Sequence, residues 1–208
     1  MPKALTTDDR TAAPAAPATD GTARPGDAPP QSRTRGEQEM TDLNVLIAFD
    51  AATIVERYPD ASRNPDAPTQ VDHSLIHMTT RHDHIIGTSG AELNLRAETG
   101  DSIRWRETTL SLSSDYKALL YRYVSSDSGH QLIRTPEIEV IDGVFPMPQE
   151  GTEGTPGFVT QNYQDHYWRT TVRKPGQVVY RFFFQILDRH RQLKGYFQWD
   201  PYITIESP

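Results

Sequence analysis

The sequence contains no cysteine among its 208 residues. This absence excludes a disulfide framework, catalysis by a thiolate and zinc sites built on cysteine. No G-x-S-x-G segment marks a nucleophilic serine, and no glycine-rich loop is followed by Lys-Ser or Lys-Thr to hold a phosphate. The chain therefore shows no recognisable catalytic residue, and we expect a protein that is not an enzyme and needs no cofactor.

Long apolar runs are absent as well. No stretch approaches the ~18 consecutive apolar residues of a membrane-spanning helix. The N-terminal segment MPKALTTDDRTAAPAAPATDG lacks the apolar centre of a secretory signal peptide. The sequence therefore predicts a cytoplasmic protein with no signal peptide and no membrane span.

The chain also lacks an excess of positive charge. It has 21 lysines and arginines against 28 acids, which gives a formal net charge of -7. Binding to nucleic acid requires a concentrated basic face, and the basic residues here are scattered among acids. We therefore expect no nucleic-acid partner.

Large apolar and aromatic residues are scarce at the N-terminus. Residues 1–39 hold eight alanines and six of the 16 prolines, with no aromatic residue. Such a segment cannot bury enough apolar surface to offset the entropy of ordering it. We predict a disordered extension over residues 1–40 and a single folded domain over 41–208. Translation starts at Met1 or at Met40, and the sequence does not decide between them.

From Leu43 onward, apolar residues recur with a period of two, as in LNVLIAF, which is typical of strands with one buried face. A short helix is predicted over 51–57, capped by Asp50. Strands are predicted over 43–49, 73–80, 82–87, 91–97, 101–108, 116–124, 137–141, 166–173, 178–187 and 193–199. Many short strands without a βαβ rhythm predict an all-β fold, an antiparallel β-sandwich of immunoglobulin-like or jelly-roll-like type.

Two segments suggest how the sandwich is connected and how it associates. The stretch 141–160, rich in glycine and proline, is predicted to cross between sheets or to cover an edge. The strand 178–187 has a core stripe on one face and further apolar residues on the other. Since edge strands pair readily, we predict self-association to a homodimer or a larger oligomer.

Histidines are the first candidate ligands. His82 and His84 are spaced so that, on a strand, both lie on one face about 6.5–7 Å apart, which suits two ligands of one metal. A third ligand would come from His73, His77 or a distant strand. The competing interpretation, which we favour, is that these are solvated side chains in an exposed hairpin and that no metal binds.

The segment GDSIRWRETTLS provides a second candidate. Alternation places Ile103 and Trp105 on one face of a strand, and Arg104 and Arg106 on the other. Two arginines at this spacing are able to hold a carboxylate or a phosphate. Pairing with acids on neighbouring strands is the alternative, and we favour it.

The C-terminal stretch GYFQWDPYITI concentrates aromatic residues beside an acid. Alternation separates Phe197 and Trp199, on the core face, from Tyr196 on the other face. Asp200 precedes a proline, which marks a break in the strand. Tyr196 and Asp200 therefore stay as candidate surface contacts for a sugar or another small ligand, whereas Trp105, Trp168 and Trp199 are predicted in the core.

These segments together resemble a known family, the PixA/AidA-like bacterial inclusion body proteins. The resemblance covers residues 42–205 and depends on the order of LNVLIAFDAATIVERYPD, NPDAPT, IHMTT, GDSIRWRETTLS, ALLYRYV, TPEIEV, VFPMP, DHYWRTTVRKPGQVVYRFFFQILD and GYFQWDPYITI. The chain departs from the family pattern in its N-terminal extension, in His77 where an aromatic residue is usual, and in His82 and His84.

The resemblance implies a compact β-sandwich in the bacterial cytoplasm that accumulates as inclusions. It also implies expression under quorum-sensing or late-growth control, in bacteria that live with hosts, and it supplies no catalytic residues. Two other functions stay open: a β-sandwich module that binds a carbohydrate or another small ligand, and a metal-dependent enzyme that uses His82 and His84.

Overall fold

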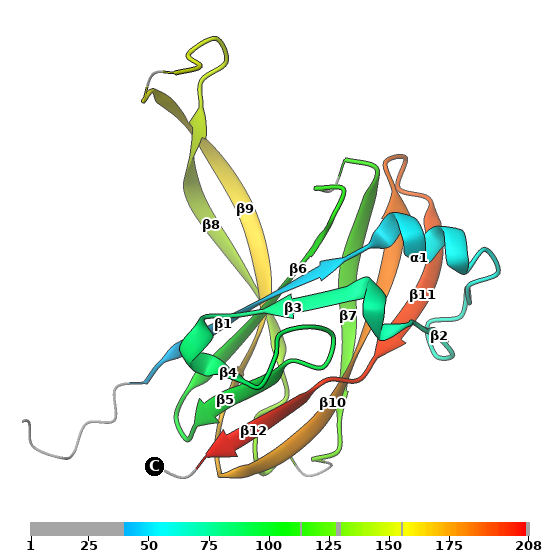
Figure 1. Cartoon of the computed structure of the whole chain (residues 1–208), viewed down its shortest axis with the longest axis vertical. Coiled ribbons are helices and arrows are strands. Elements are labelled where there is room, and N and C mark those ends of the chain that lie inside the picture. Colours follow the sequence, from blue (N-terminus) through cyan, green and yellow to red (C-terminus); the bar gives the residue numbers. More distant parts are fainter. Residues whose placement is uncertain (1–39, 113, 128–129, 155, 207–208) are drawn as a thin grey trace, which may run out of the picture. The chain divides into compact units, whose positions relative to one another are not determined.

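A computed structural model describes residues 40–112, 114–127, 130–154 and 156–206. Its elements are β1 (Asp42–Phe49), α1 (Ala51–Arg57), β2 (Thr69–Gln70), η1 (His73–Leu75), β3 (Ile76–Thr79), η2 (His82–His84), β4 (Ile85–Ile86), β5 (Asn94–Glu98), β6 (Ser102–Thr109), β7 (Tyr116–Ser125), β8 (Glu137–Pro148), β9 (Phe158–Thr171), β10 (Gly176–Asp188), β11 (Leu193–Trp199) and β12 (Tyr202–Glu206). The strands form two sheets (Figure 1), so the predicted β-sandwich is confirmed. The predicted extension over 1–40 lies, except for Met40, outside the described residues.

The first sheet has five strands in the order β3-β1-β6-β9-β8. β1 and β6 are parallel, with Val45 opposite Trp105, and the chain between them contains α1 and β2–β5. The pairs β2–β11 and β5–β12 are parallel too. The sheets are therefore mixed, whereas the sequence predicted antiparallel pairing, because apolar periodicity shows which face is buried and not the direction of the neighbouring strand.

The second sheet has seven strands and is organised around β10. β7 pairs along one edge of β10, while β11 and β12 follow each other along the opposite edge. The break between them falls at Asp200-Pro201, as predicted, and the Pro201 carbonyl still accepts a hydrogen bond from the Tyr180 amide at 2.9 Å. Phe197, Trp199, Ile203 and Ile205 are buried, so the C-terminal stretch closes the core.

Aromatic side chains fill the space between the sheets. The stripe predicted on β10 is buried at every position: Val178, Tyr180, Phe182, Phe184 and Ile186. All three tryptophans are buried as well, in agreement with their predicted core role. The Trp105 indole donates a hydrogen bond to the Tyr180 hydroxyl at 3.2 Å, so this polar pair costs little desolvation.

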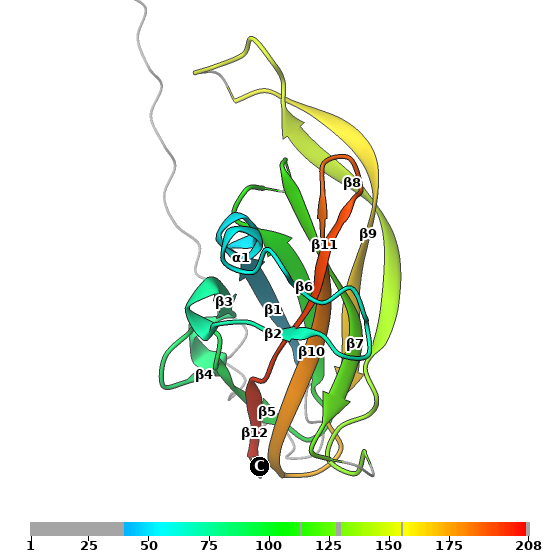
Figure 2. The same cartoon turned by 90° about the vertical axis from the view of Figure 1, so that its right-hand side faces the viewer.

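β8 and β9 form a long hairpin that extends past the end of the sandwich where α1 lies (Figures 1 and 2). β9 pairs with β6 only between Trp168 and Thr171, so among the described residues the rest of the hairpin pairs with no further strand. We call residues 140–165 the arm. The prediction that 141–160 is a connection that crosses between sheets or covers an edge was wrong, because these residues form most of this hairpin. Pro146 and Pro148 are accommodated because β8 is an edge strand, where a missing amide breaks no ladder.

The helix prediction is confirmed. α1 begins after Asp50, whose side chain accepts a hydrogen bond from the Thr53 amide at 3.2 Å. No helix in the described part of the chain is long and apolar enough to cross a membrane.

The turn between β10 and β11 is held by one acid. The Asp188 carboxylate accepts hydrogen bonds from the Gln192 and His190 amides, each at 2.9 Å, and pairs with Lys194 at 2.9 Å. The Gln192 amide, followed by Lys194 and the His190 amide, lowers the pKa of Asp188 from its ordinary 3.8 to about 2.

A pH dependence follows from Asp188. Because its pKa is lower in the folded state, the carboxylate adds stability above its ordinary pKa, and this is lost as the pH falls toward 2. We expect Asp188→Asn to lower the melting temperature at pH 7, with the difference from wild type closing between about pH 4 and pH 2. Thermal melts across this range test it, with Asp60→Asn, in an exposed loop, as the control. A difference that stays constant with pH contradicts the prediction.

Candidate functional site

Arg104 and Arg106 lie side by side in a groove on the outer face of the five-stranded sheet. β6 alternates as predicted, with Ile103 and Trp105 buried and the two arginines on the outer face. The groove has a volume of about 490 Å³. Its lining comes from β1, the segment after β3, β6 and the base of the arm: Asn44, Val45, Leu46, Thr79, Thr80, Arg81, Arg104, Arg106, Ile141, Tyr163, Asp165 and Tyr167.

Both arginines pair with acids on neighbouring strands. Arg104 lies 2.9 Å from Asp42 on β1, and its guanidinium stacks over the Tyr167 ring at 5.2 Å. Arg106 lies 2.6 Å from Asp165 on β9. Cross-strand pairing, the interpretation favoured from the sequence, is therefore what the structure shows. The groove therefore presents two guanidinium groups and two tyrosine rings, and the charge of each guanidinium is largely balanced by its acidic partner.

A buried acid lies next to this groove. Backbone pairing between β6 and β9 ends at Trp105 and Trp168, and beyond them the two strands separate. The side chain of Glu107 is only 1% exposed. Its Oε1 atom forms a hydrogen bond with Nε2 of His166, and the two atoms are 2.8 Å apart. The Leu120 amide contacts the same oxygen at 3.4 Å, and Oε2 has no hydrogen-bond partner among the described residues.

This pair was not predicted from the sequence. Its one signal was position: Glu107 follows Ile103 and Trp105 on the inward face of β6, where an acid is unusual. The partner was not visible, because His166 lies 59 residues away in the chain. Together with Arg106 and Asp165, the pair connects β6 to the base of the arm, around a second groove of about 370 Å³.

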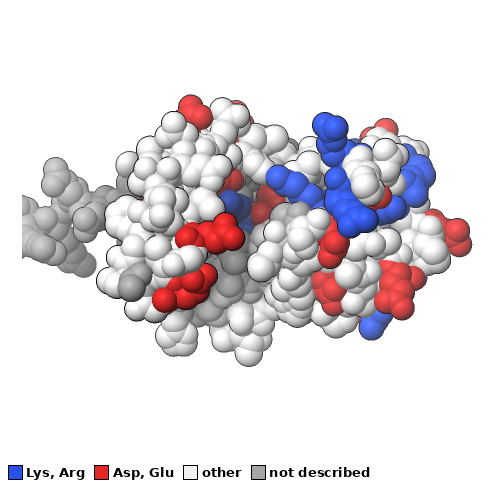
Figure 3. Space-filling view, turned by 90° about the horizontal axis from the view of Figure 1, so that it is seen from above, with Lys and Arg blue, Asp and Glu red and all other residues white. Residues whose placement is uncertain are grey.

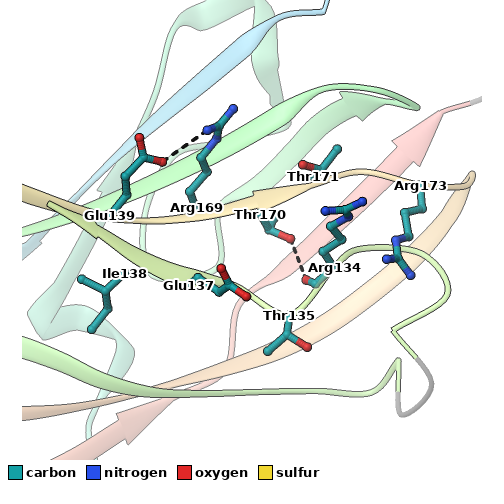
Figure 4. Close-up of a pocket in the computed structure, with 9 residues that line it drawn as sticks. All are labelled: Arg134, Thr135, Glu137, Ile138, Glu139, Arg169, Thr170, Thr171 and Arg173. Atoms are coloured by element: carbon teal, nitrogen blue, oxygen red, sulfur yellow. Dashed lines mark hydrogen bonds and ion pairs between the residues drawn. The ribbon is translucent and has the colours of Figure 1, made fainter. Parts of the chain in front are cut away.

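A third groove, of about 610 Å³, lies where the chain enters β8 (Figure 4). Figure 4 shows Arg134 and Arg173 near one end of it and the Arg169–Glu139 pair, 3.2 Å apart, at the other. The Tyr167 hydroxyl and Arg169 lower the pKa of Glu139. Every charged side chain here is exposed or half-buried, so the groove is a solvated surface feature.

The histidine pair does not lie on a strand. His82 to His84 form a 3-10 turn closed by a hydrogen bond from the His84 amide to the Arg81 carbonyl at 3.0 Å. Of the predicted strand 82–87 only Ile85–Ile86 (β4) is a strand, so the strand spacing predicted for the two histidines was wrong. His73 also opens a 3-10 turn, where the sequence predicted a strand. Among the described residues, no group of three or more His, Cys, Asp or Glu is placed to hold a metal.

Tyr196 and Asp200 lie apart from the arginines, on the seven-stranded sheet. Tyr196 packs edge to face against Tyr121, with ring centroids 5.4 Å apart. Asp200 lies 3.3 Å from His73, which also contacts Glu92 at 3.3 Å. Of the four ligand candidates, the structure therefore brings together Arg104 and Arg106 only.

The arm exposes more large apolar side chains than any of the grooves. Val144 is 63% exposed, Phe145 53% and Phe158 68%, and Val140, Met147, Val159 and Tyr163 are also exposed. Tyr163 lies over Gly143 across the hairpin, where a Cβ atom would approach its ring to 2.6 Å. Apolar surface gathered in this way is typical of interaction sites.

These features define a β-sandwich of two mixed sheets with an aromatic core, a charged outer groove and an apolar arm. The chain belongs to the PixA inclusion body protein family, whose model matches residues 41–205. The resemblance predicted from the sequence is therefore confirmed.

A solved structure agrees on the fold. The crystal structure of a PixA inclusion body protein from Burkholderia cenocepacia J2315 matches with a TM-score of 0.68 and 20% sequence identity, covering 82% of this chain and 98% of that one. The solution structure of amebosin matches with a TM-score of only 0.21 and 8% identity, covering 67% of this chain and 100% of that one. Curated proteins give no match.

Proposed function

We propose that this chain is a non-enzymatic inclusion body protein that accumulates in the cytoplasm by association with copies of itself. The observation that carries the proposal is the exposed apolar surface of the arm, which no other strand covers. Membership of a family described as inclusion body proteins supports the proposed accumulation. The resemblance adds quorum-sensing or late-growth control in a host-associated bacterium, and protein levels and inclusions followed against cell density test that part.

The arm is expected to be required for association. Replacing Val144, Phe145 and Phe158 by serine removes three of the four most exposed large apolar side chains of the arm, so the protein should become monomeric at micromolar concentration. Light scattering and sedimentation measure this on the full chain.

A matched control replaces Val124 and Val179, which are 49% and 46% exposed on the other sheet, by serine. It removes apolar surface of similar exposure away from the arm and should leave association unchanged. A wild-type protein that stays monomeric over the whole concentration range contradicts the proposal.

Binding of a small anion in the outer groove is a second candidate function. Two arginine forks and two tyrosine rings around about 490 Å³ suit a carboxylated sugar. We expect millimolar glucuronate, and not glucose, to raise the melting temperature saturably, and Arg104→Ala to abolish the shift. Arg181→Ala, on an exposed face of β10, is the control. No shift with glucuronate rules out this candidate.

A further inference from the structure

The arm carries charge of one sign. Residues 140–165 include Asp142, Glu150, Glu153 and Asp165 and contain no lysine or arginine. Glu150 and Glu153 are exposed in the turn at the tip, and neither makes an ion pair within the described ranges. The tip is therefore apolar and acidic together.

The opposite combination occurs at the β10–β11 turn. Arg189 and Arg191 are exposed there, and Lys117 is exposed on β7 directly opposite Leu187. Lys194 is already paired with Asp188, whereas no acid among the described residues lies within ion-pair distance of the other three. We call Lys117, Arg189 and Arg191 the basic end.

Apolar side chains accompany the basic end. Leu110 is 54% exposed and Leu112 is 86% exposed, in the loop that leads from β6 to β7. The loop lies beside the turn, because the Thr109 hydroxyl bonds to the Tyr116 carbonyl at 2.9 Å and Tyr116 pairs with Asp188. The loop also carries one exposed acid, Asp115, against the three cations of the basic end. The surface is therefore apolar with an excess of positive charge, which complements the arm in both respects.

Figure 3 views the molecule from above, so the tip of the arm and the β10–β11 turn both face the reader. Lysine and arginine side chains gather on the right-hand part of this face, while acidic side chains are spread over both parts. Both surfaces therefore lie at the same end of the sandwich. Two copies facing each other across a two-fold axis are able to make each contact twice.

We propose that two copies associate reciprocally, with the arm of each docked on the basic end of the other. This inference rests on the proposed self-association and names its surfaces. Arm-to-arm pairing would bring acids against acids, which costs free energy. Docking on the basic end brings Glu150 and Glu153 toward Arg189 and Arg191 and covers the apolar side chains of both surfaces.

Charge reversal tests the pairing. The arm variant carries Glu150→Lys and Glu153→Lys, and the end variant carries Arg189→Glu and Arg191→Glu, all at exposed positions. Each variant alone places like charges in contact, so its dimer dissociation constant should rise about tenfold or more. Mixed together, the two variants have opposite charges at both contacts and should form a one-to-one dimer close to wild-type affinity.

Sedimentation of each full-length variant and of the mixture gives the result, and circular dichroism confirms folding. Recovery of the dimer in the mixture alone supports reciprocal docking. If the variants dimerise as wild type does, or if mixing restores nothing, the inference is overturned. Self-association through the arm then still stands or falls by the serine variant of Val144, Phe145 and Phe158, so the two failures are distinguishable.

Discussion

Replacing Trp199 by alanine is expected to lower the free energy of unfolding by about 3–5 kcal/mol, the largest effect we predict for one side chain. Trp199 is completely buried and stacks with Phe182 at a centroid distance of 5.8 Å. It also meets Phe49 at 5.3 Å and Phe184 at 5.6 Å, so its removal opens a cavity that touches both sheets. Its indole nitrogen has no partner among the described residues, so the loss comes from packing.

Urea unfolding followed by circular dichroism measures this change, since the substitution also alters the fluorescence. The control is Val179→Ala, on the exposed face of β10, which should change the free energy by no more than about 0.5 kcal/mol. A loss below about 1 kcal/mol for Trp199→Ala would show that the aromatic core does not pack around this residue.

The second large effect is expected at the base of the arm. His166→Ala removes the partner of a carboxylate that is 1% exposed, leaving Glu107 with the Leu120 amide at 3.4 Å. An unsatisfied buried acceptor costs about 1–3 kcal/mol, so we expect a loss of that size in urea unfolding at neutral pH.

A double-mutant cycle separates the pair from general damage. Glu107→Gln makes the buried group neutral, so His166→Ala should cost at least about 0.5 kcal/mol less in that background. Arg81→Ala, which breaks an exposed pair with Asp83, should cost no more than about 0.5 kcal/mol. Strict additivity of Glu107→Gln and His166→Ala would mean that the 2.8 Å contact adds nothing.

Much of the fold was predictable because its elements follow local periodicity. The stripe from Val178 to Ile186, the cap at Asp50 and the break at Asp200 each depend on neighbouring residues. Strand direction was not predictable, since Val45 meets Trp105 across 60 residues of chain. The arm was missed because prolines and glycines are typical of loops, and only the position of β8 at a sheet edge makes them compatible with a strand.

The candidate site was also predictable only in part. Arg104 and Arg106 were found because they alternate with two buried residues on one strand. Their partners, Asp42 and Asp165, required the sheet order. Glu107 was missed because its partner, His166, lies on β9 at the point where β9 separates from β6. The sequence of β6 alone does not indicate this separation.

The two prolines of β8 have one more consequence. Pro146 and Pro148 are two residues apart and pair with Thr160 and Phe158 of β9, so both nitrogens face the same side. Since proline has no amide hydrogen to donate, we expect that side to be the free edge of β8. Without amide hydrogens at these two positions, the free edge of β8 is a poor template for another strand, whereas the outer edge of β9 has no such protection. Contacts made along this edge of β8 are therefore expected to be held by side chains and to weaken on dilution or a change of salt.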